Sequence, residues 1–152
     1  MDRRRRRTRR MTQGAPWLIA GGLLSAIASV LHLLIIAGGP AWYRWFHAGE
    51  KMAVMAERGD PQAWVVTLGI AAVLAVFAAY AFSAAGVIPP LPMMRLGLVG
   101  ISAVFLARGL ALLPLFVWKR QLVDSFILWS SLIVLVYGGV YAIGTWLAWP
   151  QL

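Results

Sequence analysis

Arg108 is the residue of this sequence whose type and position best suit chemistry. It stands between Ala107 and Gly109, about midway along a run of apolar residues. A guanidinium placed in a hydrocarbon layer costs at least about 2.5–3.5 kcal/mol, so its side chain is expected to face protein and to need hydrogen-bond acceptors. Two roles are open: a fixed positive charge that binds an anion or a lipid headgroup, or a structural donor that holds helices together.

Other polar residues could share this chemistry. Ser25, Ser29 and His32 follow one another at spacings of four and three residues, which places them on one face of a helix. His32 could relay protons, because free imidazole titrates near physiological pH, or it could make a neutral interhelical hydrogen bond. Tyr80, Tyr137 and the backbone carbonyls near Pro114 are further candidate acceptors for Arg108. No carboxylate lies in an apolar stretch, so Glu50 would have to fold inward to pair with it. The candidate binding residues are Arg108, His32, Ser29, Ser25, Tyr80 and Glu50.

The sequence lacks the motifs of common cofactor sites and enzymes. It has no cysteine, which excludes disulfides and iron–sulfur clusters. A b-type haem needs two facing axial histidines, and of His32 and His47 the second lies in a polar loop. The spacing of His32, His47 and Glu50 matches no zinc pattern. There is no phosphate-binding loop, nucleophile elbow or carboxylate pair, so we expect no cofactor, no metal and no catalytic residue.

Four long apolar stretches would position these side chains. They cover about residues 16–38, 62–85, 96–118 and 126–149, and each is long enough to supply the roughly 20 residues that a helix needs to cross a membrane. Hydrophobic residues make up 61% of the chain, more than a water-facing domain can bury. We predict an all-α polytopic membrane protein, with residues 16–152 forming one domain of four transmembrane helices in an up-down-up-down bundle.

The first loop, between Gly39 and Pro61, predicts a further short helix. Its apolar residues recur at spacings of three and four, which suits a helix lying in the membrane interface. That helix could be a plain connector or a lid over the bundle. The residues of this apolar face are Trp42, Trp45, Phe46, Gly49, Met52, Ala53 and Ala56. Farther along the chain, Asp60 and Pro61 are suited to start the second span, and Pro114 predicts a kink in the third.

Residues 1–15 form an arginine-rich tail that we expect to be disordered and cytoplasmic. Seven arginines lie between Arg3 and Arg10, and each would contribute about 1 kcal/mol beside anionic lipids. Such a run can also contact nucleic acid, but next to a membrane span it is better explained as a determinant of topology. We expect both termini on the cytoplasmic side and no nucleic-acid partner. The charges of the later loops favour the reverse orientation, so a start of translation at Met11 would reverse the prediction.

Small residues on the second span predict close helix contact. Ala71, Ala75, Ala79 and Ser83 follow at intervals of four, and small side chains let helices approach closely in lipid. The contact could lie within one bundle or between copies. A homo-oligomer or a membrane-protein partner is therefore possible.

Three segments of the chain resemble small four-span membrane proteins encoded in bacterial genomes. These segments are Trp42–Glu50, Phe105–Leu110 and Tyr141–Trp146. The resemblance implies a bacterial inner-membrane location and no established activity. Two functions remain open: an accessory protein whose helices bind partner subunits or copies of itself, and a small carrier or binding protein. The second would use Arg108 and His32 for an anion, a lipid headgroup or protons.

Overall fold

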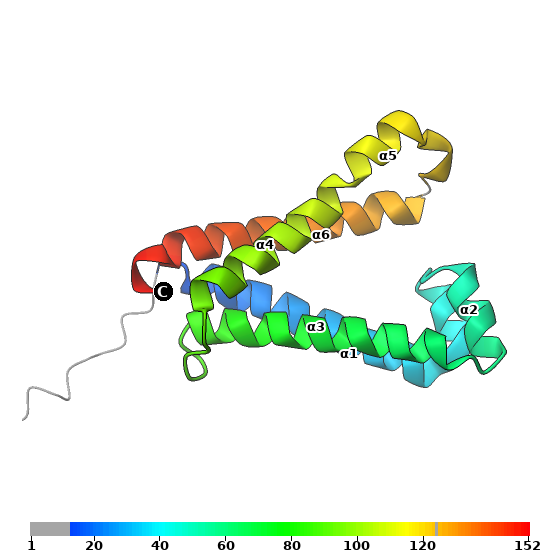
Figure 1. Cartoon of the computed structure of the whole chain (residues 1–152), viewed down its shortest axis with the longest axis horizontal. Helices are drawn as coiled ribbons and strands as arrows, with labels where there is room; N and C mark the ends of the chain where they lie inside the picture. Colours follow the sequence, from blue (N-terminus) through cyan, green and yellow to red (C-terminus); the bar gives the residue numbers. More distant parts are fainter. Residues whose placement is uncertain (1–12, 124) are drawn as a thin grey trace, which may run out of the picture.

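A computed structural model of the chain describes residues 13–123 and 125–152 (Figure 1). The predicted tail therefore lies almost entirely outside the described residues, as does Asp124. Within these ranges the chain consists of helices and turns, with no strand. The elements are α1 (Ala15–Trp45), α2 (Glu50–Glu57), α3 (Pro61–Ala84), α4 (Met94–Leu110), α5 (Leu112–Trp118), η2 (Arg120–Leu122), α6 (Ser125–Ala148) and η3 (Trp149–Gln151).

Four helical segments of the described chain are long and apolar enough to cross a membrane. They are Ala15–Trp45, Pro61–Ala84, Met94–Trp118 and Ser125–Gln151, which confirms the four predicted stretches. Large apolar side chains point outward from them: Val30, Val76 and Val136 are each more than half exposed. A surface of this kind is stable against acyl chains and unfavourable in water. The chain is thus all-α, with the features of a multi-pass membrane protein.

The first span continues beyond its predicted end, after a break. At Gly39 the backbone leaves the helical region, with φ 65° and ψ −156°, and Pro40 begins a short further piece that ends at Trp45. Asp60 caps α3 as its sequence predicts, accepting a hydrogen bond from the backbone N–H of Gln62 at 2.9 Å.

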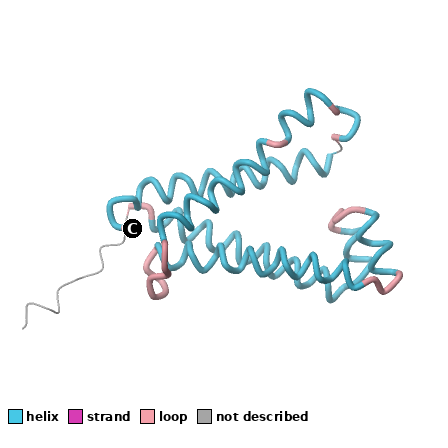
Figure 2. The backbone as a smooth tube through the Cα atoms, in the orientation of Figure 1, coloured by secondary structure: helices cyan, strands magenta, loops and turns pink. Residues whose placement is uncertain are grey.

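The first loop contains a short helix, α2, but a sharp corner precedes it, so the residues of the predicted apolar face do not share one helix. His47 and Gly49 both have positive φ, 52° and 101°, so the chain turns sharply between the end of α1 and the start of α2. The predicted apolar face is therefore divided between two helical pieces. Tyr43 and Ala53 are buried between them and α3. Figure 2 shows these turns as short loops on either side of α2.

The helices pack as two pairs. α1 lies along α3, and α4 lies along α6. The pairs meet near the C-terminus, where α1 also contacts α6, and they diverge toward α2 and α5 (Figure 1). The main core fills the joined end and includes Leu18, Leu98, Phe105 and Tyr141. A second, smaller core lies beneath α2. The molecule therefore has a joined end and an open end.

The third span is broken at Ala111, close to the kink predicted at Pro114. The proline ring conflicts with the carbonyl group four residues earlier, at Leu110, which is where α4 ends. Pro114 lies in the first turn of α5, where its missing N–H removes no hydrogen bond of that helix. The break directs α5 away from the α1–α3 pair (Figure 1).

Candidate binding site between the helix pairs

Arg108 lies in the last turn of α4 and meets α6. Its Nη1 donates a hydrogen bond to Oγ of Ser131, with 3.2 Å between the two atoms. Ser131 is fully buried, whereas the Arg108 side chain is exposed. A guanidinium has five N–H donors, and among the described residues Ser131 is the one acceptor that Arg108 meets. The other donors are left for a ligand or solvent.

An apolar hollow lies in front of Arg108, and we call it the inner hollow. It has a volume of about 390 Å³ and is lined by α3 on one side and by α4 and α6 on the other. Arg108 is the one charged residue in its lining. The lining consists of Val66, Gly69, Ile70, Val73, Leu74 and Phe77 of α3, Val104, Phe105 and Arg108 of α4, and Val134 of α6.

Close contact between α4 and α6 holds Arg108 against Ser131. A Cβ atom on Gly109 would overlap the side chain of Leu135 and lie 3.1 Å from its backbone nitrogen. A Cβ atom on Gly138 would lie 3.0 Å from the backbone nitrogen of Leu106. Both glycines therefore permit an approach that larger residues would prevent.

Ser25 and Ser29, which were predicted with Arg108, bond elsewhere. Tyr141 OH donates to the carbonyl oxygen of Phe77 at 3.0 Å, so its single hydrogen is used. Ser25 Oγ, 2.9 Å from Tyr141 OH, must then be the donor of that pair. This polar junction of Ser25, Phe77 and Tyr141 joins α1, α3 and α6. Ser29 Oγ donates to the carbonyl of Ala71 at 2.7 Å and ties α1 to α3.

His32 and Tyr80 also have partners of their own. Nδ1 of His32 lies 2.7 Å from the carbonyl oxygen of Ala28 one turn earlier, and its ring is half-buried. A carbonyl only accepts, so Nδ1 carries the proton in this contact. Tyr80 OH donates to the carbonyl of Pro92 at 3.2 Å and anchors the α3–α4 turn. The described residues contain no group of three His, Cys, Asp or Glu side chains that could hold a metal.

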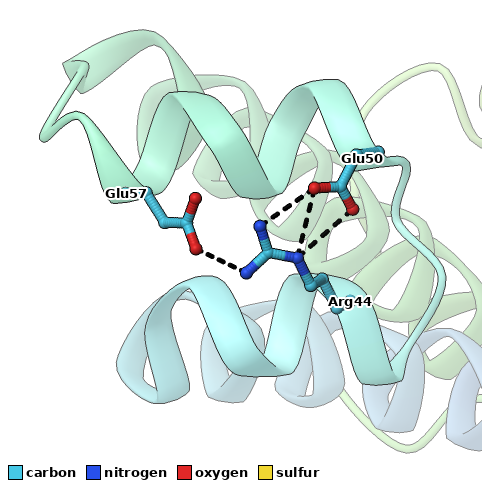
Figure 3. Close-up of polar contacts among 3 residues, drawn as sticks. All are labelled: Arg44, Glu50 and Glu57. Carbon is cyan, nitrogen blue, oxygen red and sulfur yellow. Dashed lines mark hydrogen bonds and ion pairs between the residues drawn. The ribbon is translucent and has the colours of Figure 1, made fainter.

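Glu50 belongs to an ion cluster at the open end. Figure 3 shows the guanidinium of Arg44, at the end of α1, between Glu50 and Glu57 of α2. Nη2 of Arg44 lies 2.9 Å from Oε1 of Glu50, and Nη1 donates to Glu57. Hydrogen bonding by Arg44 lowers the pKa of the Glu57 carboxyl group. The cluster fixes α2 against α1, and its exposed side chains make its contribution to stability small.

A second hollow, which we call the vestibule, borders this cluster. It has a volume of about 570 Å³ and lies between the α1–α2 corner and the start of α6. The rings of His47 and Phe126 stack across it, with centroids 6.0 Å apart and planes inclined by 21°. Its lining consists of Tyr43, Arg44, His47, Ala48, Gly49, Glu50, Phe126 and Ile127.

Ser131, Tyr141 and Tyr43 were not identified from the sequence. The acceptors predicted for Arg108 did not include Ser131. Tyr43, almost fully buried, lies 2.9 Å from Thr67 Oγ1 and donates to the carbonyl of Ala63 at 3.2 Å. The sequence signal that could have identified Ser131 is the pair Gly109 and Gly138, because small residues indicate where α4 and α6 approach closely.

Comparisons with protein-family models, with curated proteins and with solved structures find no match to this chain. The geometry of the chain itself must therefore support any functional proposal.

Proposed function

We propose that this chain is a multi-pass inner-membrane protein that binds an amphiphile between its two helix pairs. The head group of the amphiphile carries a phosphate or a carboxylate, which pairs with Arg108. The supporting observation is the guanidinium of Arg108, which faces an apolar hollow and has one hydroxyl acceptor among the described residues. A charge in an apolar setting is stabilised by a counter-charge. The membrane spans contain no carboxylate, and the anionic head group of a bound amphiphile would supply this counter-charge.

The size of the inner hollow favours an amphiphile over a partner helix. A helix about 10 Å across occupies roughly 400 Å³ in every 5 Å of its length. The hollow of about 390 Å³ would therefore hold about one turn. The same volume lies within the range of about 300–1,000 Å³ that is typical of small-molecule sites, which are mostly apolar with a few polar groups. An acyl chain with its head group at Arg108 has that character.

In this proposal the four long helices cross the membrane alternately, up and down. Both termini lie in the cytoplasm, where the arginine-rich tail contacts anionic lipids. The open end with α2 then lies at the periplasmic interface, and Trp42 and Trp45 beside it suit that depth. Reporter fusions to the C-terminus test this orientation, and periplasmic activity of such a fusion would contradict it.

The test of the proposed function compares two arginines of the same helix. The full chain is purified in neutral detergent, mixed with phosphatidylglycerol, and the retained lipid is measured by native mass spectrometry. Arg108→Leu should weaken retention about tenfold or more, because it removes charge-assisted hydrogen bonds. Arg95→Leu removes the same charge at the other end of α4, where Arg95 contacts Leu152 and Trp149, and should have little effect. Equal retention by the wild type and Arg108→Leu would refute the proposal.

An accessory role, with binding to partner subunits or copies of the chain, stays a prediction. Of the small residues on α3, Ala71 is buried against α1, whereas Ala75 is exposed. Ala75→Leu should therefore leave the fold intact and reduce the apparent size on gel filtration if copies associate through this face. An unchanged size would exclude association through Ala75.

A further inference from the structure

The vestibule combines aromatic rings with a carboxylate. His47 and Phe126 supply two exposed rings that stack on each other, Tyr43 supplies a third ring that is almost fully buried, and Glu50 supplies the carboxylate. Ring faces attract cations, and enclosures of several rings are a known means of binding ammonium groups. The lining of the vestibule is therefore suited to a cation that is partly apolar.

The net charge of the neighbouring ion cluster also favours a cation. Glu50 and Glu57 share the single guanidinium of Arg44, so the three side chains together carry one net negative charge (Figure 3). Oε1 of Glu50 accepts from both Nε and Nη2 of Arg44, whereas Oε2 accepts only from Nε and retains a lone pair for a second donor. Arg108, in contrast, is a positive charge beside the inner hollow. The open end thus has an ion cluster with one net negative charge beside the vestibule, and a positive charge beside the inner hollow.

One face of α6 connects the two hollows. Ile127 lines the vestibule, Ser131 binds Arg108, and Val134 lines the inner hollow. Spacings of four and three residues place these side chains on the same side of the helix. One turn, about 6 Å along the helix axis, separates the level of Ile127 from that of Ser131. The start of α6 and the α1–α2 corner lie together at the open end in Figure 1. An ammonium group two carbon atoms from a phosphate oxygen has a comparable reach.

We infer that the ligand is a zwitterionic phospholipid whose ammonium group lies in the vestibule, while its phosphate binds Arg108 and Ser131. Its acyl chain follows the inner hollow. This inference rests on the proposed function for the phosphate and the acyl chain, and adds the vestibule as a separate ammonium site. The ammonium can be primary, as in phosphatidylethanolamine, or quaternary, as in phosphatidylcholine. Stronger binding of the quaternary head group would identify the rings as the main contact, and stronger binding of the primary one would identify Glu50.

The experiment compares head groups that share a phosphodiester. The full chain in neutral detergent is titrated with phosphatidylethanolamine, phosphatidylcholine and phosphatidylglycerol of the same acyl chains, and retained lipid is measured by native mass spectrometry. We expect at least one ammonium lipid to bind about tenfold more tightly than phosphatidylglycerol. Glu50→Gln and Phe126→Leu should reduce this preference to about twofold or less without changing the binding of phosphatidylglycerol. Glu50→Asp keeps the charge and should restore most of the preference.

Matched controls separate the possible failures. Trp129 is a strongly exposed aromatic residue of α6 that lines neither hollow, so Trp129→Leu should keep the preference. Equal or tighter binding of phosphatidylglycerol by the wild type would overturn the ammonium site and leave the role of Arg108 standing. Retention of all three lipids that does not depend on Arg108 would overturn the proposed function itself. A preference that survives both Glu50→Gln and Phe126→Leu would place the ammonium outside the vestibule and contradict the inference.

Discussion

The joined end and the open end of the molecule both contain polar groups among apolar helices, but the two ends differ in how completely these groups are hydrogen-bonded. At the joined end, Tyr141 donates to Phe77 and accepts from Ser25, so the hydroxyl hydrogens of this junction have partners. Of the described side chains at that end, Thr145 is buried with its hydroxyl unpaired. At the open end, Arg108 meets one hydroxyl with five donors. Buried polar groups that are fully paired hold helices together, whereas a charged group with unpaired donors can bind a ligand. The comparison separates residues that maintain the fold from residues that are available for binding.

Tyr141→Ala should cause the largest loss of stability at the joined end. The side chain of Tyr141 is fully buried, packs against Phe105, and bonds α1 and α3. Its removal leaves a cavity and should lower the free energy of unfolding in detergent by about 3–5 kcal/mol. Trp146→Ala on the same helix removes a strongly exposed ring and should cost less than about 1 kcal/mol. Similar losses for the two variants would show that the joined end is not the stabilising region.

Gly109→Ala tests whether close packing positions Arg108. The added methyl group would meet Leu135 and push α4 from α6, which should cost about 1–3 kcal/mol. The matched control is Gly139→Ala, because a Cβ atom there would have no neighbour within 4 Å. It should be neutral or slightly stabilising, since alanine favours a helix more than glycine does. Equilibrium unfolding in detergent measures both, and equal values would argue against tight contact at Gly109.

Arg108→Leu should affect the free energy of unfolding differently from changes at the polar junction, which lower it. In lipid-free detergent, the free energy of unfolding should change by less than about 1 kcal/mol or rise, because the variant removes a poorly paired charge along with one hydrogen bond. Tyr141→Phe, which deletes only a hydroxyl of the junction, should cost about 0.6–1.7 kcal/mol. If Arg108→Leu is instead the more destabilising of the two, Arg108 is a structural residue and the contrast between the ends is lost.

The ion cluster predicts a small, local dependence on pH. Arg44 lowers the pKa of Glu57 below its ordinary value of 4.5. The stabilisation from this pair is fully present above pH 4.5 and is lost as the pH falls through the pKa of the folded state. Amide hydrogen exchange in α2, corrected for intrinsic rates, should accelerate over that range while exchange in α6 stays slow. Glu57→Gln should exchange faster at neutral pH and lose the dependence; a variant that keeps it would assign the effect to another group.

The sequence was sufficient for the spans and insufficient for their arrangement. Length and apolarity define a membrane helix because the hydrocarbon layer has a fixed thickness, so the four spans were predicted closely, except that the first continues to Trp45 after the break at Gly39. The divergence of the two pairs could not be predicted, because side chains facing lipid and those facing the inner hollow are equally apolar. Arg108 was identified from the free-energy cost of placing a guanidinium in the hydrocarbon layer. Its partner could not be identified, because it depends on how α4 and α6 are rotated about their axes. Ser130 and Ser131 are adjacent in sequence, and only one of them binds Arg108.

The inner hollow is bordered by exposed side chains such as Val66, Ile70 and Val104, so it opens sideways between α3 and α4. If the proposed amphiphile binds there, it can reach the hollow by diffusing within one leaflet without passing through water. Its occupancy would then follow its mole fraction among the surrounding lipids, and material added to the aqueous phase would matter only after it partitions. A shift in leaflet composition would therefore change the amount bound to this protein.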